Sequence, residues 1–148
     1  MTNSGSVAST EVFKQLNSAD VERVSQLLSK ATSVDGVRPL SEHAWLHLHS
    51  SESGLHILGF LHDEFSAYAH VDITDLVDGT STEVVVSPSA RNQGLGRAMV
   101  ERAWELSPDG RLRLWAHGAT VEAQSFADSI GYLLNRSLWQ MRRSLFAP

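Results

Sequence analysis

Apolar residues in the first third of the chain recur every three or four positions, which is typical of helices with one buried face. A first helix is predicted over residues 18–35, because it begins at a serine that can cap it and is followed by Gly36. Its apolar face consists of Val21, Val24, Leu27, Leu28 and Ala31. A second, shorter helix is predicted over residues 41–50, where Leu40 and Trp45 have the spacing of a hydrophobic staple.

The period then changes to two and β-branched residues become frequent, which indicates strands. The predicted strands cover residues 55–61, 65–72, 82–86, 112–116 and 133–141. The first two are close enough in sequence to form a tight hairpin. Two more helices are predicted at residues 95–106 and 120–131, where glycine or proline follows the apolar pattern. This order of elements predicts a mixed α/β (α+β) fold in which about four helices flank one sheet.

The length and composition of the chain indicate a single domain. Its 148 residues are enough for one hydrophobic core, and 42% hydrophobic with 20% charged residues is ordinary for a globular protein. Residues 1–10 are polar and are expected to be poorly ordered, which leaves one domain over residues 11–148. Because no apolar run approaches about 20 residues and the polar start lacks the features of a signal peptide, we expect a cytoplasmic protein without a membrane partner.

Composition also excludes several kinds of chemistry. The chain has no cysteine, which rules out disulfides, thiolate zinc sites and a cysteine nucleophile. Its net charge of −5 argues against a nucleic-acid partner. Seven histidines are present, and His43 and His47 share one helix face, but two ligands do not make a zinc site. We therefore expect no metal.

The most informative segment is the one in which the 82–86 strand runs through a glycine-spaced turn into a helix. Gly94 and Gly96 remove side chains where the backbone bends and a ligand comes close, and the first N–H groups of the helix have no partners within it. Together with the helix dipole, these groups favour a bound phosphate. Arg91 and Arg97 add two positive charges beside the glycines. An ordinary tight turn between a strand and a helix is the alternative.

Two common phosphate-binding loops do not fit this segment. The chain has no G-x-x-x-x-G-K-[ST] sequence, and in the G-x-G-x-x-G pattern Met99 takes the place of the third glycine. The spacing Arg91-x-x-Gly94-x-Gly96, after a strand that carries Glu83, instead resembles the pyrophosphate-binding motif of the GCN5-related N-acetyltransferase (GNAT) family.

This resemblance implies acetyl-CoA as the acyl donor and a GNAT fold. In that fold a mixed, mostly antiparallel sheet splays open at its centre, here between the strands at 82–86 and 112–116. The pantetheine arm of the donor would pair with the main chain of the first of these strands, as an added strand would. The residues expected to bind acetyl-CoA are Val84, Val85, Val86, Arg91, Asn92, Gln93, Gly94, Leu95, Gly96 and Arg97.

Longer stretches resemble the amino-terminal half of the mycothiol synthase family. They are SVDGVRPLSE, EVVVSPSARNQGLGRAM, LWAHG and WQMRRSL, and the similarity covers residues 10–146. These actinobacterial enzymes acetylate the cysteine amine of cysteinyl-glucosaminyl-inositol to give mycothiol. They consist of two GNAT domains in tandem, and acetyl transfer is assigned to the second.

The resemblance to the first of these tandem domains implies an N-acetyltransferase domain that acts on the same amine. Two alternatives remain open. One is a non-catalytic, acetyl-CoA-binding half that supports a second, catalytic GNAT domain in cis or in trans. The other is a stand-alone N-acetyltransferase of another small amine.

Three residues are candidates for catalysis or substrate binding. Glu83 is the expected general base, because burial beside the thioester site would raise the pKa of its carboxyl; pairing with an arginine or exposure to solvent is the alternative. The family resemblance assigns Glu42 to the substrate, whereas its other possible role is a favourable charge in the first turn of a helix. His117 follows the 112–116 strand and is expected to contact the acyl group or substrate, unless it only bonds to a helix start.

The tyrosine that many GNAT enzymes use as a general acid has no counterpart in this sequence. Counting back four residues from Gly131 gives Ala127, and the neighbouring Phe126 has no hydroxyl. Tyr132 lies beyond the predicted helix, where we expect it to pack in the sheet. This departure favours the non-catalytic alternative and leaves acetyl-CoA binding untouched.

Overall fold

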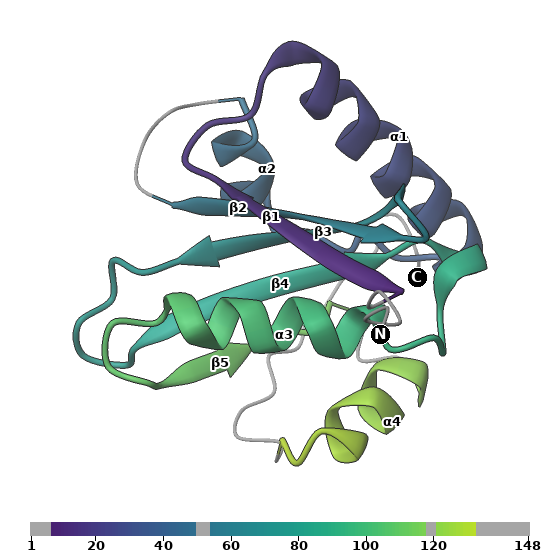
Figure 1. Ribbon diagram of the computed structural model, residues 1–148. Coiled ribbons are helices and arrows are strands. Elements are labelled where there is room, and N and C mark those ends of the chain that lie inside the picture. The colour runs from purple at the N-terminus through teal and green to yellow at the C-terminus, as the bar shows by residue number, and fades with distance from the viewer. Residues whose placement is uncertain (1–6, 50–53, 118–120, 133–148) are drawn as a thin grey trace, which may run out of the picture.

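The computed structural model describes residues 7–49, 54–117 and 121–132, which form one five-stranded sheet with helices on both faces (Figure 1). The strands are β1 (Ala8–Phe13), β2 (Leu55–Leu61), β3 (Glu64–Asp72), β4 (Thr80–Val86) and β5 (Leu112–Leu114). They lie in the sheet in the order β1-β2-β3-β4-β5. All neighbours are antiparallel except β4 and β5, which are parallel. The predicted mixed, mostly antiparallel sheet is confirmed.

Helices pack on both faces of this sheet and create two hydrophobic clusters. The helices are α1 (Ser18–Asp35), α2 (Glu42–His47), α3 (Leu95–Leu106) and α4 (Val121–Ser129), with a 3-10 turn η1 (Pro88–Ala90). α1 and α2 pack on the face that carries Leu58, Tyr68 and Val85, whereas α3 packs on the face that carries Ala67 and Val71. Successive residues of each strand therefore alternate between two cores. None of the helices in the described residues combines the length and apolar character that a membrane span needs.

The strand β1 differs from the sequence-based expectation. Residues 8–10, expected to be poorly ordered, belong to this strand, which pairs with β2 along its whole length. The segment alternates between partly buried and exposed positions as far as Val12. Ser9 and Glu11 are exposed and Thr10 is partly buried, so polar residues lie on both sides of the strand. Pairing with β2, rather than a strong local preference, makes it a strand. Residues 1–6 lie outside the described part of the chain.

The helix boundaries lie close to those predicted. The side chain of Asn17, rather than that of Ser18, caps α1 by accepting a hydrogen bond from a first-turn N–H at 2.8 Å. Ser41 caps α2 as predicted, although this helix ends earlier than expected. The predicted cap at Thr120 and the predicted strands at 133–141 lie outside the described residues.

β4 and β5 separate after a short parallel ladder. Their register ends at Thr82↔Leu114, and Trp115 N donates one further bond to Thr82 O at 3.1 Å. β5 is therefore shorter than predicted, while β4 continues to Val86 with no strand paired on this side among the described residues. The opening that the family resemblance implies begins here.

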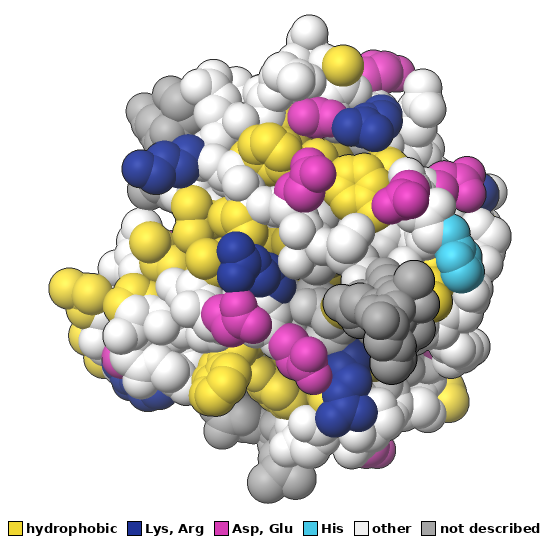
Figure 2. Space-filling model, viewed as in Figure 1, with side chains coloured by type: hydrophobic (Ala, Val, Ile, Leu, Met, Phe, Trp, Pro, Cys, Tyr) yellow, Lys and Arg dark blue, Asp and Glu magenta, His cyan; other side chains and the backbone are white. Residues whose placement is uncertain are grey.

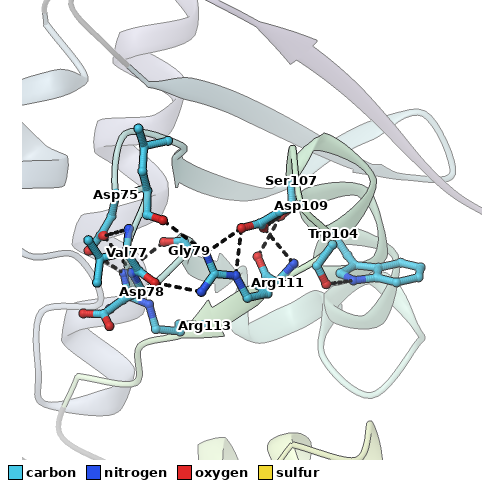
Figure 3. A network of polar contacts seen from close by, with 11 residues as sticks. Asp75, Val77, Asp78, Gly79, Trp104, Ser107, Asp109, Arg111 and Arg113 are labelled. Atoms are coloured by element: carbon cyan, nitrogen blue, oxygen red, sulfur yellow. Dashed lines mark hydrogen bonds and ion pairs between the residues drawn. The ribbon is translucent and has the colours of Figure 1, made fainter.

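A polar network holds the closed end of the β4–β5 pair (Figure 3). Arg111, just before β5, donates from Nη1 to Val77 O at 2.7 Å and from Nη2 to Leu76 O at 3.3 Å. Arg113 donates from Nη2 to Gly79 O at 3.1 Å. Both arginines connect the start of β5 to the loop before β4. The two strands are thus fastened at their beginnings and diverge at their ends.

Candidate functional site

The helix α3 follows β4 and its N-terminus lacks a side-chain cap. Its N-cap residue Gly94 has a left-handed φ of +86°, and Gly94 O accepts the first helical bond from Ala98 N at 3.1 Å. The N–H groups of Leu95, Gly96 and Arg97 precede this bond, so they have no partner within the helix. A Cβ atom at Gly94 would meet no atom within 4 Å. These N–H groups could therefore hold an anion such as a diphosphate.

Gly96 has a different role from Gly94. A Cβ atom at Gly96 would lie 3.1 Å from Cε1 of Phe126 and 3.7 Å from Cγ2 of Val86. Gly96 therefore allows α4 to approach the start of α3 closely. The expectation that both glycines make room for a ligand has to be corrected for Gly96, whose missing side chain makes room for the Phe126 ring.

The two arginines of this segment have different partners. Arg91 donates from Nη1 and Nη2 to the two carboxylate oxygens of Asp35, both at 2.7 Å, and from Nε to Val86 O at 3.2 Å. The hydrogen bonds with Arg91 lower the pKa of Asp35. Arg91 thus ties the end of β4 to α1, and its charge is already balanced, contrary to the expectation that it faces a ligand.

Arg97 is the exposed cation of the segment. Its side chain is 66% exposed and pairs with Glu101 at 3.2 Å, one turn further along α3. Figure 2 shows acidic and basic side chains side by side over this helix. Exposed pairs of this kind exchange partners at little cost, so Arg97 remains available to an anionic ligand.

Three further residues predicted to bind acetyl-CoA lie in or beside the turn before α3. Asn92 has a φ of +61°, and the exposed Gln93 reaches Ser89 O from Nε2 at 3.5 Å. The side chain of Leu95 is 1% exposed and belongs to the core beneath α3. Leu95 can therefore offer a ligand its main chain but not its side chain.

The main-chain groups of β4 alternate between its two edges. Thr82 O accepts a bond from the β5 side, whereas Ser87 N donates to the β3 side at 2.7 Å. By this alternation the N–H and C=O groups of Val84 and Val86 face the opening, where Val86 O already accepts the bond from Arg91 Nε. Those of Val85 face β3, so the expectation that Val85 also pairs with the ligand has to be corrected.

Glu83 points from β4 toward the α2 face, at the start of the opening, and both its oxygens have partners. Oε1 accepts a hydrogen bond from Ser41 N at 2.8 Å and contacts Nε2 of His117, while Oε2 accepts one from Ser41 Oγ at 2.9 Å. Burial alone would raise the pKa of this carboxyl, but the hydrogen bonds from His117 and Ser41 outweigh burial and lower it. The predicted direction of this pKa shift is therefore wrong.

The structure places the two residues expected to bind substrate on different elements. His117 lies against Glu83, with its side chain 31% exposed. Glu42 is exposed in the first turn of α2, the position of its alternative role. Its neighbour Ser41 is the residue that reaches β4. The sequence marks Ser41 as a helix cap, but nothing local indicates that its hydroxyl also binds a carboxylate.

The described residues of α4 include no tyrosine that could act as the general acid. The helix carries Ala127 at the position in question and has no tyrosine between its described ends. Tyr132 follows the helix, where its N–H donates to Ala127 O at 2.9 Å, and burial raises the pKa of its phenol. Phe126 faces the start of α3, as described above.

Four histidines gather where α2 packs on the sheet. His47 Nδ1 lies 3.0 Å from His70 Nε2, His56 Nδ1 lies 2.7 Å from the hydroxyl of Tyr68, and the rings of His43 and His47 are 4.2 Å apart. Burial lowers the pKa of both His56 and His70 to about 4, so both are neutral near pH 7. Among the described residues, no group of side chains is arranged to hold a metal ion.

His56 and His70 were not among the residues singled out from the sequence. They face each other across β2 and β3. The observed turn pairs Leu61 with Glu64, and a register shift between Gly59 and Phe60 then brings His56 opposite His70, so the pairing depends on this irregularity as well as on the turn.

The model of the acetyltransferase (GNAT) family matches residues 21–132, and the chain belongs to this family. It is 47% identical over 135 residues to a mycothiol acetyltransferase of Streptosporangium roseum, which covers 90% of this chain and 40% of the relative. It is 45% identical over 143 residues to one from Acidothermus cellulolyticus, which covers 93% of this chain and 43% of the relative. The chain thus spans less than half the length of these relatives.

Solved structures with the same fold include two acetyltransferases that are named for different acceptors. One is an aminoglycoside acetyltransferase from an uncultured soil metagenomic sample, with a TM-score of 0.61, 14% identity and coverage of 94% of this chain and 97% of that chain. Another is the ribosomal-protein-S18-alanine N-acetyltransferase of Escherichia coli, with a TM-score of 0.58, 19% identity and coverage of 83% and 77%. At such identities the likeness shows the fold alone, and the predicted GNAT fold is confirmed.

Proposed function

We propose that this domain binds acetyl-CoA and acetylates the cysteine amine of cysteinyl-glucosaminyl-inositol to give mycothiol. The observation that carries the proposal is the uncapped start of α3 at Gly94, which follows the unpaired edge of β4. The mycothiol acetyltransferases similar to this chain supply the choice of amine. A cytoplasmic location and the absence of a metal, nucleic-acid or membrane partner belong to the same proposal.

Acetyl-CoA would be held by the main chain more than by side chains. Its diphosphate would lie before the N–H groups of Leu95, Gly96 and Arg97, where the helix dipole favours negative charge. Its pantetheine arm would pair with the main chain of Val84, as an added strand does. When bound, it supplies an acetyl group activated as a thioester.

A second candidate function is a non-catalytic half that binds acetyl-CoA and supports another GNAT domain in cis or in trans. Two observations favour it. α4 carries Ala127 where many enzymes of the family have a tyrosine, and the chain covers 40% of the length of one close relative. A stand-alone acetyltransferase of another small amine is the third candidate.

Calorimetry with acetyl-CoA, followed by mass-spectrometric detection of N-acetylated product, separates these candidates. The first proposal expects saturable binding and acetylation of cysteinyl-glucosaminyl-inositol by this chain. Binding without any product supports the non-catalytic half. Binding with product from other small amines, but not from this one, supports the third candidate, and absence of binding contradicts all three.

A further inference from the structure

We propose that His117 is the group that accepts the proton of the acceptor amine, and that Glu83 and Ser41 are positioning residues that orient its ring. This inference rests on the proposed acetyl transfer and deepens it. It also replaces the sequence-based assignment of Glu83 as the general base.

Glu83 is poorly suited to accept a proton itself. It is 7% exposed, and the Ser41 N–H and hydroxyl bind one oxygen each, at 2.8 and 2.9 Å. His117 Nε2 contacts the same oxygen as the Ser41 N–H. Hydrogen bonds to a carboxylate stabilise its charged form, so Glu83 stays ionised and is a weak base near pH 7. A carboxylate so held can instead fix the position and tautomer of an imidazole.

His117 has the properties that Glu83 lacks. Because Nε2 faces an ionised carboxylate, the neutral ring carries its hydrogen on Nε2, which leaves the lone pair on Nδ1. The side chain is 31% exposed, so it is accessible from outside the core. His117 also follows β5 by three residues, at the point where β5 and β4 separate. The base therefore lies at the mouth of the opening in which the thioester is proposed to bind.

Ser41 connects this pair of residues to α2. Its hydroxyl donates to Glu83 and accepts from Ala44 N at 3.2 Å, so one side chain caps the helix and holds the carboxylate. Two ionisable side chains of β3, His70 and Tyr68, lie on the same face of the sheet as Glu83, but they do not compete for the proton of the amine. His70 lies opposite Glu83 in the register of β3 and β4, and burial lowers the pKa of His70 to about 4. Burial raises the pKa of Tyr68 well above its usual range, so its phenol stays neutral.

The transfer balances with these groups alone. The amine nitrogen attacks the carbonyl carbon of the thioester, so that a C–N bond forms and the C–S bond breaks. The surplus proton on nitrogen passes to Nδ1 of His117. The departing sulfur takes up one proton, from the imidazolium or from water, so that an amine and a thioester become an amide and a thiol. Removing a positioned base of this kind costs about 10²- to 10⁴-fold in rate.

The test compares His117→Ala and Glu83→Gln in the whole chain, with His49→Ala as a matched control on an exposed histidine near the end of α2. Each variant is titrated calorimetrically with acetyl-CoA, and kcat is measured from pH 5 to 9 with cysteinyl-glucosaminyl-inositol. We expect unchanged acetyl-CoA affinity in all three. We expect kcat to fall about 10²- to 10⁴-fold in His117→Ala, with recovery on addition of imidazole as a free base.

Glu83→Gln separates a base from a positioning residue. We expect its kcat to fall about 10- to 100-fold, as for other partners that orient a histidine, while the acid limb of the pH profile persists. Loss of that limb in Glu83→Gln and its retention in His117→Ala would identify Glu83 as the base and overturn the proposal. Wild-type kcat in His117→Ala, or a loss that imidazole does not restore, overturns it as well.

Failure of the proposed function can be distinguished from failure of the role proposed for His117. If the wild-type chain does not bind acetyl-CoA, the ligand assignment is wrong, and the role of His117 is refuted together with it. If the chain binds acetyl-CoA but transfers no acetyl group, the non-catalytic half is supported, and acetyl transfer by this chain and the role of His117 are both refuted. If the chain transfers the acetyl group and His117→Ala keeps the wild-type kcat, the role of His117 alone is refuted.

Discussion

The N-termini of α2 and α3 lie on opposite faces of the sheet and differ in whether the protein itself provides partners for their first N–H groups. At α2, Ser41 supplies a side-chain cap, and the carboxylate of Glu83 adds an anion from within the protein. At α3, Gly94 has no side chain to act as a cap, and no atom lies within 4 Å of the place that a Cβ would take. Both ends attract negative charge. α2 thus has its anion built in, whereas the first N–H groups of α3 have no partner within the helix and are proposed to bind a ligand.

Acid should destabilise the protein through the two buried histidines on the α2 side of the sheet. His56 and His70 have a pKa of about 4 in the folded chain, compared with 6.5 ordinarily. The unfolded chain therefore binds more protons between these values, and the free energy of unfolding falls as the pH drops from 6.5 toward 4. At about 1.4 kcal/mol per pKa unit, the loss approaches roughly 3 kcal/mol for each histidine.

Urea unfolding at a series of pH values measures this loss. His70→Gln should flatten the dependence, and His49→Gln, on an exposed residue, should leave it as it is. A free energy of unfolding that stays constant from pH 6.5 to 4.5 in the wild type would contradict the explanation.

Gly94→Asn should fill the place that α3 leaves open. Asparagine tolerates a left-handed φ, unlike valine, so the fold should persist while the new side chain occupies the ligand space. We expect acetyl-CoA affinity to fall about 100-fold, or about 2.7 kcal/mol, by calorimetry. Gly110→Asn is the matched control, because Gly110 has a φ of +73° and equally open surroundings in another turn. Equal affinity in the two variants would show that the ligand binds elsewhere.

Ser41→Ala and Glu83→Gln should reveal how strongly α2 depends on its built-in anion. Each variant leaves a buried polar group with fewer partners, so we expect each to lower the free energy of unfolding by about 1–3 kcal/mol. Because the two side chains bond to each other, the double variant should lose less than the sum. Urea unfolding of all four proteins gives the coupling, with the exposed Ser29→Ala as a control near zero. Strict additivity would argue against the hydrogen bond.

Arg97→Gln should have the smallest effect, and on binding rather than stability. The side chain is exposed, so loss of its charge should weaken acetyl-CoA binding by about two- to fivefold, and less in high salt. Arg91→Gln should do the reverse and lower stability through loss of the Asp35 pair. Calorimetry and urea unfolding of both variants test this division. A larger loss of affinity in Arg91→Gln with unchanged stability would invert it.

The sequence predicted elements well where local signals decide them. The capped amphipathic pattern of α1, the hairpin of β2 and β3, and the glycine turn before α3 depend on neighbours a few residues apart. β1 was missed because its polar residues become a strand by pairing with β2, which lies more than forty residues later.

The candidate site was predicted less well because its side chains have distant partners. Asp35 lies 56 residues from Arg91 and converts a predicted ligand contact into a tertiary ion pair. Ser41 and His117 lie 42 and 34 residues from Glu83, and together they reverse the predicted pKa shift. No pattern within one segment gives such information, since the shift is set by groups that only folding brings together.

The arginines at the start of β5 have a mechanical consequence. Arg111 and Arg113 fix the beginnings of β4 and β5, so any change in the angle between these strands grows with distance along them. We therefore expect β4 and β5 to pivot about the loop before β4. We expect a ligand bound between the far ends of β4 and β5 to limit this motion. Both α2 on one face of the sheet and α4, which contacts α3, should then respond to the same binding event.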